Sequence, residues 1–279
     1  AGEYEREFDT LVAGVRMRAP MMSIHTVAAG GGSILHFDGA RLRVGPDSAG
    51  ANPGPACYRR GGPLAVTDAN VMLGRIQPAF FPRVFGPHAD EPLDRDVVVQ
   101  RFSALAEEIA AATGSRKSAE EVAVGFLDIA VRNMAEAIKK ISVQRGHDVT
   151  RYTLSVFGGA GGQHACRVAD ALGMTRIFAH PLAGVLSAYG MGLADQTAMR
   201  EESVERRLAA DAMGALGATL DRLGADAIQD LRSQGVALDS IRVVRRAHLR
   251  YEGTDTALIV LAGTLGEMQG AFDTEYLKR

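Results

Sequence analysis

The sequence predicts an α/β protein, and three observations carry this prediction. Residues 153–179 run through strand, glycine-rich turn, helix and strand, which is the pattern of a βαβ unit. Ser118 and Glu121 form a capping box ahead of a stripe of apolar residues at helical spacing. Further strand and helix patterns lie before and after these segments, so both types of element occur along the whole chain.

The first 44 residues are expected to form strands. Residues 1–20 have a strand-like apolar pattern, and residues 23–27 are expected to be a short buried strand. Two further runs, 34–37 and 41–44, flank a turn at Gly39, where glycine readily takes the left-handed dihedrals of a tight turn. These two runs therefore predict a β-hairpin.

The next segment, residues 45–62, holds too many glycines and prolines for regular structure. It is also too poor in charge for a flexible linker, so an ordered loop is expected. Asp68 follows it and is expected to cap a short helix that runs through Leu73.

Two helices are expected in the middle of the chain. Asp94 or Asp96 can cap the first, which ends near Gly114. The second opens at Ser118 and stops at Gly146. Its apolar stripe recurs at helical spacing and indicates one buried face.

The βαβ unit follows directly. A strand at 153–157 leads through a turn at 158–162 into a helix at 163–172, and a second strand covers 175–179. The part after this unit is expected to alternate helices and strands: small residues suited to close helix packing at 181–195, a long helix at 203–234, strands at 241–251 and 257–261, and a last helix at 265–277.

Composition excludes several classes of function. The chain has 279 residues, 47% of them hydrophobic, and its 31 basic and 33 acidic residues give a formal charge of −2, so it offers no general attraction to nucleic acid or an anionic membrane. Cys57 and Cys166 are far apart and lack metal-ligand spacing, which fits the reducing cytoplasm. The absence of a signal peptide agrees with that location, and the two ends of the sequence suggest a piece of a longer protein.

The strongest candidate for chemistry is the glycine-rich turn of the βαβ unit. Bare amides and a helix N-terminus favour an anionic or polar ligand, and glycines let a flat group lie against the backbone. The alternative is that the glycines serve tight packing of the helix. The candidate ligand-contacting residues are Gly158, Gly159, Ala160, Gly161, Gly162 and His164.

A second candidate is a loop that could contact substrate or phosphate through its amides. It comprises Gly30, Gly31, Gly32 and Ser33, and the alternative is a tight turn that feeds the hairpin. Asp68 could orient a ligand or a metal-bound water, although a capping role is favoured. The scattered histidines lack metal spacing, so no metal site is expected, and no catalytic residue stands out.

Several long motifs resemble the hydantoinase A / 5-oxoprolinase family over nearly the whole chain. They include SIHTVAAGGGSI at 23–34, residues 44–75, NMAEAIKK at 133–140, the glycine turn, and PLAGVLSAYGMGLAD at 181–195. The resemblance implies an actin-like ATPase fold, as in sugar kinases and heat-shock ATPases. Residues 1–199 would be the second-lobe portion, and residues 200–279 a C-terminal α+β extension.

The same resemblance implies ATP with magnesium as cofactor, with the glycine turn as the adenosine-contacting segment. The family's two acidic-glycine phosphate loops do not occur in this sequence, so the isolated chain is not expected to turn over ATP. The longer protein would open a small cyclic amide, a hydantoin or 5-oxoproline, beside a B-type subunit or domain. An ATP-dependent ketone carboxylase subunit is the close alternative, and a non-catalytic assembly module is the alternative of another class.

Overall fold

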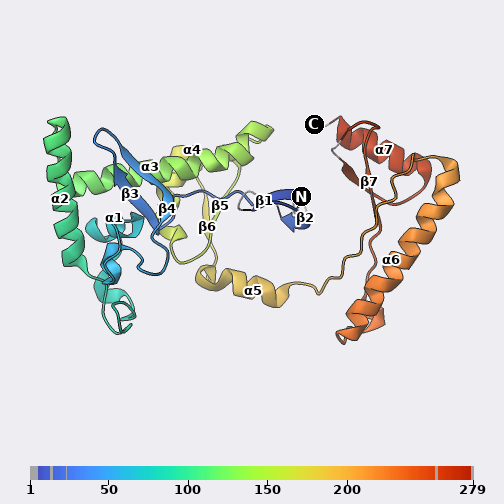
Figure 1. Ribbon diagram of the computed structural model, residues 1–279, viewed down its shortest axis with the longest axis horizontal. Coiled ribbons are helices and arrows are strands. Elements are labelled where there is room, and N and C mark those ends of the chain that lie inside the picture. The colour runs from blue at the N-terminus through green and yellow to red at the C-terminus, as the bar shows by residue number, and fades with distance from the viewer. Residues whose placement is uncertain (1–5, 13–14, 23, 255–256, 278–279) are drawn as a thin grey trace. The chain divides into compact units, whose positions relative to one another are not determined.

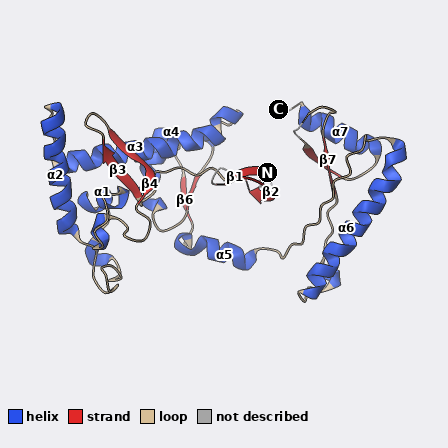
Figure 2. Cartoon of the chain, viewed as in Figure 1, coloured by secondary structure: helices blue, strands red, loops and turns tan. Residues whose placement is uncertain are grey.

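The computed structural model describes residues 6–12, 15–22, 24–254 and 257–277. The chain divides into two compact units, residues 1–190 and residues 191–279, and Figures 1 and 2 show the elements of each. None of the helices in the described ranges is both long and apolar enough to cross a membrane.

The strands at the start of unit 1 form two antiparallel hairpins. β1 (Arg6–Val12) pairs with β2 (Val15–Met22), so the described part of the strand-like run at 1–20 contains two strands. β3 (Ser33–Phe37) pairs with β4 (Leu42–Ser48), which confirms the predicted hairpin.

The short buried strand expected at 23–27 is wrong within the described residues 24–27. These residues form no strand and are exposed, with Ile24 at 69%. Residue 23 lies outside the described ranges. The apolar pattern misled because burial needs a neighbouring surface, and within residues 24–29 only Ala29 is buried.

Three helices follow the hairpins: α1 (Val66–Met72), α2 (Arg95–Thr113) and α3 (Ala119–Ile141). Asp94 caps α2 by accepting from the Val97 amide, and the helix closes at Gly114 as predicted. The capping box of Ser118 and Glu121 opens α3, also as predicted.

α3 is the central helix of unit 1 and contacts α1, α2, α4 and β4. Val122, Phe126 and Ala130 on one part of it are fully buried in the larger core, together with residues of α1 and α2. Val131 and Ala135 belong to a second core that it shares with α4. Full burial of a side chain such as Phe126 contributes about 2 to 3 kcal/mol, so α3 anchors both cores.

The predicted βαβ unit is confirmed. β5 (Leu154–Val156) pairs in parallel with β6 (Ile177–Ala179), and α4 (Ala165–Leu172) lies between them in the chain. α4 packs against α3 (Figure 1). Its Val168, Ala169 and Leu172 belong to the second core. The glycine turn is therefore held between a strand and a helix that is packed on its inner face.

The irregular segment expected at 45–62 begins later than predicted, because residues 45–48 belong to β4. The rest of the segment is ordered around one buried carboxylate, that of Asp68. The Asp68 oxygens accept from the backbone amides of Ala56 at 3.0 Å, Cys57 at 2.8 Å and Ala65 at 2.8 Å. Asp68 is not the residue before the helix, as the sequence had suggested, because α1 begins at Val66 and Asp68 is its third residue. From that position one side chain satisfies donors of both the loop and the helix end.

Close backbone approach also shapes this loop. A Cβ at Gly62 would lie 1.7 Å from the Gly54 carbonyl oxygen, so this position accepts only glycine. Burial and the negative charge of Asp68 raise the pKa of the fully buried Cys57 thiol, which therefore stays protonated at neutral pH.

Unit 2 begins inside α5 (Leu186–Leu193), whose side chains are largely exposed rather than closely packed. α6 (Met213–Ser233) starts ten residues later than the expected 203, because 203–209 are irregular and 210–212 form a 3₁₀ turn. β7 (Arg246–Leu249) is shorter than the predicted strand, and it pairs antiparallel with β8 (Leu258–Leu261). α7 (Leu265–Tyr276) closes over them, with Met268 and Phe272 in a small core of its own.

Replacing Asp68 is expected to destabilise unit 1. Three backbone N–H groups donate to the two oxygens of the Asp68 carboxylate. In Asp68→Asn the side-chain NH₂ group replaces one of these oxygens and cannot accept, so the free energy of unfolding should fall by about 3 kcal/mol. Urea denaturation followed by circular dichroism measures this change. Asp90→Asn, at an exposed position of the same unit, is the control, and equal stability of the two variants would contradict the role given to Asp68.

The two thiols are expected to differ in reactivity. Cys166 is exposed on α4, whereas Cys57 is fully buried beside a carboxylate. The native chain should therefore react with one equivalent of Ellman's reagent and with a second only in denaturant. Cys166→Ser should abolish the native reaction, and a persistent fast thiol in that variant would show that Cys57 is accessible.

Candidate functional site

The glycine turn joins the carboxyl end of β5 to the amino end of α4. Gly158 has a φ of 84°, in the left-handed region that favours glycine, and it turns the chain out of the strand. Its N–H donates to the Ala183 carbonyl at 2.8 Å, which ties the turn to the segment before α5. Ala183 is a contact that sequence reasoning missed, although its segment was among the family motifs.

The turn presents bare backbone to its surroundings. A Cβ built at Gly158, Gly159 or Gly162 would meet nothing within 4 Å, and these residues are exposed, as is Ala160. Gly161 differs, because its Cβ would lie 3.0 Å from the Val156 side chain. Tight packing therefore accounts for Gly161, while it gives no reason for the other glycines.

The surroundings of the turn are apolar as well as open. Phe157 precedes it at 58% exposure, and Leu182, next to the tethering Ala183, is 41% exposed. Gln163, Gly162 and Gly161 form a single 3₁₀ turn that leads into α4. A flat ligand on the turn would therefore have apolar side chains beside it and the N-terminus of α4 close to it.

His164 is the N-cap residue of α4, and its side chain is buried. It is only 4% exposed, and neither ring nitrogen has a hydrogen-bond partner in the part of the chain that is described. Burial first, and then the positive charge of Arg75, lower the pKa of His164, so its ring is neutral at pH 7. The structure thus separates His164 from the exposed face that Gly159 and Ala160 present.

The second candidate loop lies against α1. The carbonyl of Gly31 accepts from the amide of Thr67 at 2.9 Å and from its hydroxyl at 3.0 Å, and that of Gly32 accepts from the Ala49 amide. Ser33 is buried at the start of β3. No hydrogen bond joins this loop to the glycine turn among the described residues, so the two candidate sites are not brought together by direct contact.

The carboxylate of Asp68 is also enclosed, with three backbone donors around it and 0% exposure. Burial is the main cause that raises its pKa, and the hydrogen bonds act in the opposite direction. Its present contacts are structural. A role for Asp68 or for Gly30 to Ser33 in holding substrate or phosphate stays a prediction.

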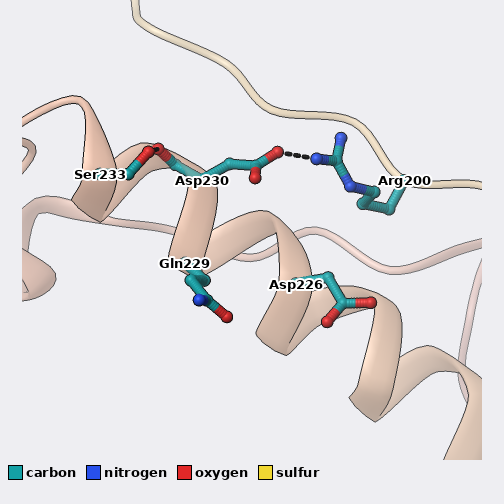
Figure 3. A pocket seen from close by; sticks show the side chains of 5 residues that line it. All are labelled: Arg200, Asp226, Gln229, Asp230 and Ser233. Carbon is teal, nitrogen blue, oxygen red and sulfur yellow. Dashed lines mark hydrogen bonds and ion pairs between the residues drawn. The ribbon is translucent and has the colours of Figure 1, made fainter.

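Two charged surface depressions were not expected from the sequence. One, of about 480 Å³, lies in unit 2 beside α6, where Arg200 pairs with Asp230 (Figure 3). The other, of about 570 Å³, lies between α3 and α4 and is lined by Asp128, Val131, Arg132, Ala135, Glu136, Lys139, Arg167, Asp170 and Ala171. Within the described ranges, no three His, Cys, Asp or Glu side chains gather where they could hold a metal ion.

A match to a family model identifies the class of protein. Residues 1–200 match the hydantoinase/oxoprolinase family, and the chain belongs to this family. It is 41% identical over 285 residues to 5-oxoprolinase 1 of Arabidopsis thaliana, a match that covers 99% of this chain and 22% of that protein. The chain therefore spans about a fifth of the length of this relative.

Solved structures agree with this fold. The ATP-dependent caprolactamase of Pseudomonas jessenii superposes with a TM-score of 0.67 at 29% identity, over 98% of this chain and 40% of that one. A nucleotide-free acetone carboxylase superposes with a TM-score of 0.72 at 22% identity, over 99% and 40%. The actin-like ATPase type of fold expected from the sequence is confirmed.

His164 makes the stability of unit 1 depend on pH. Because its pKa in the folded chain is below the usual 6.5, the unfolded chain binds the proton more tightly. The contribution of neutral His164 to the free energy of unfolding is complete above pH 6.5. It is lost as the pH falls through the lowered pKa of the folded chain, by at most about 1.4 kcal/mol per pH unit.

This dependence is expected to disappear in His164→Gln. The difference in unfolding free energy, parent chain minus His164→Gln, should decrease as the pH is lowered from 7.5 to 5. Urea denaturation of both proteins at each pH measures it. His147→Gln, at an exposed position, serves as the control. A difference that stays constant with pH would contradict the neutral state given to His164.

Proposed function

We propose that this chain forms part of an ATP-dependent enzyme that opens a cyclic amide, and that the glycine turn holds the nucleoside part of ATP. Family membership supports this proposal, because a relative of this chain is named a 5-oxoprolinase. A structure that it resembles at 29% identity is named an ATP-dependent caprolactamase. Both names denote enzymes that act on cyclic amides.

The single observation that carries the proposal is the empty space above the turn. Three glycines present backbone with no side chain within 4 Å of where a Cβ would lie, at the point where a strand feeds a helix. A purine and its sugar need a flat backbone surface, an apolar border and nearby amide donors. The turn, with Phe157 and Leu182 beside it, offers these features.

The chemistry explains why such an enzyme uses ATP. A ring amide is stabilised by resonance and resists water at neutral pH. When bound, ATP supplies a phosphoryl group that converts the amide oxygen into a leaving group. The part of this chain is to hold the nucleoside: Gly158 sets the direction of the turn, and Gly159 and Gly162 keep the surface bare.

Magnesium, a B-type partner and a cytoplasmic location belong to this proposal as well. Transferred phosphates are normally neutralised by a magnesium ion, which supports the first. Exposed apolar side chains such as Phe178 and Val185, at 51% and 57% exposure, support a further protein surface against unit 1. A ketone carboxylase is not favoured, because the likeness to acetone carboxylase concerns the fold alone.

Nucleoside binding by the chain tests the proposal. Gly159 does not need a left-handed φ and has open space around it, so Gly159→Val should fold normally and fill the surface where the base would lie. We expect calorimetry to show weak adenosine or ADP binding that falls at least about tenfold in this variant.

Gly214→Val in α6 of unit 2 is the matched control and should bind as the parent does. Equal affinity of the Gly159→Val chain, at unchanged circular dichroism, would reject the turn as a nucleoside site. No binding to the parent at millimolar nucleotide would favour the assembly module, in which the glycines serve contact with another protein.

A further inference from the structure

Three nitrogen-rich side chains, His164, Arg167 and Arg75, lie near enough to one another to interact electrostatically at the start of α4. His164 and Arg167 are one helical turn apart and therefore share a face of α4. Arg75 comes from the segment after α1. Burial, and then the charge of Arg75, lower the pKa of both His164 and Arg167. α3, which contacts both α1 and α4, holds these elements together.

The polar atoms of this cluster are not satisfied by the protein. Both ring nitrogens of His164 and Nη1 of Arg167 are buried without a hydrogen-bond partner among the described residues. A buried polar group without a partner destabilises the folded chain, and a charged one does so more strongly. His164 and Arg167 share a face of α4, so an acceptor bound there can take a hydrogen bond from the protonated ring nitrogen of His164 and one from Nη1 of Arg167.

The charge of the cluster selects the kind of group. A second guanidinium nitrogen of Arg167, Nη2, pairs with Asp128, so the positive charge of Arg167 is compensated. Arg75 has no carboxylate partner within the described ranges and is exposed. One positive charge is therefore left over beside a neutral imidazole that has an N–H to donate.

We propose that Arg75, His164 and Arg167 form a binding site for an oxyanion, a phosphate or carboxylate group. Arg75 faces solvent and forms the entrance, Arg167 donates from Nη1, and His164 donates from whichever ring nitrogen carries its proton. Two guanidinium groups around one oxyanion give the charge-assisted hydrogen bonds that suit phosphate and carboxylate. A bound anion also relieves the repulsion between Arg75 and Arg167.

Other occupants suit the cluster less well. A metal cation would meet the uncompensated charge of Arg75. The carboxylate that pairs with the cluster among the described residues, that of Asp128, is already bound to Arg167. A single water could satisfy two of the orphaned atoms, yet it would leave the positive charge unbalanced. The site goes beyond the proposed nucleoside contact, because it needs neither a base nor the exposed face of the turn.

The test follows the imidazole of His164 by ¹⁵N NMR while inorganic phosphate is added to the 279-residue chain. His164→Gln assigns the resonance. We expect a saturable shift, and in Arg75→Gln a loss of affinity of at least about tenfold. Arg83→Gln, an exposed arginine of the same unit, is the matched control and should bind phosphate as the parent does.

Separate additions distinguish the sources of the oxyanion. A shift with acetate as well as phosphate indicates a general oxyanion site, whereas a much stronger response to ADP than to phosphate indicates that a nucleotide carries the group. Adenosine alone should leave the His164 resonance in place. The first two results support the site, since each depends on the same three side chains, and the unchanged resonance with adenosine shows that the base does not produce the shift.

Two results would overturn the inference. One is the absence of any His164 shift at millimolar phosphate, acetate or ADP. The other is an equal loss of affinity in the Arg75 and Arg83 variants, which would mean unspecific attraction. Adenosine binding with no anion effect would reject this site and keep the nucleoside proposal, while the reverse pattern would reject that proposal and keep this site.

Discussion

The burial of α3 is the constraint on which the rest of unit 1 depends. One part of this helix fills the core shared with α1 and α2, through Phe126 above all, and the next turns fill the core shared with α4. Because the two cores have α3 in common, the end of α1 and the start of α4 are fixed relative to each other. That fixed placement brings the charge of Arg75 to bear on His164 and Arg167.

The glycine turn shows how rigid and open backbone can coexist. Its entry is fixed by the left-handed Gly158 and the bond to Ala183, and its exit is fixed by the buried face of α4. Between these two anchors the chain carries no side chain on the exposed face of Gly159 and Gly162. Preorganised backbone of this kind loses little conformational entropy when a ligand binds, because it is ordered beforehand.

Local signals in the sequence predicted those parts of the fold that depend on neighbouring residues. The capping box of Ser118 and Glu121 and the Gly114 end of α2 are contacts within a few residues, and the structure confirms both. The predicted start of α6 and the predicted strand at 24–27 were wrong, because burial rather than periodicity decides whether such a segment becomes regular structure. Sequence patterns carry no record of which surface will cover a given segment.

The candidate site was predictable to the same extent. The turn itself follows from its glycines between strand and helix, but the inward orientation of His164 and the proximity of Arg75 arise from contacts between distant segments. Asp68 is a similar case, since its partners Ala56 and Cys57 belong to a loop with no regular pattern. Only the packing of α1 against that loop reveals the carboxylate as a structural centre.

The unequal placement of the two cysteines has a practical consequence. Cys166 is exposed on α4 and stands in the chain between His164 and Arg167, while Cys57 is enclosed. A fluorophore or spin probe attached to the unmodified protein would thus sit at one known position, beside the segment whose occupancy matters most. The native sequence therefore already contains the attachment site for a spectroscopic probe, and no cysteine has to be introduced.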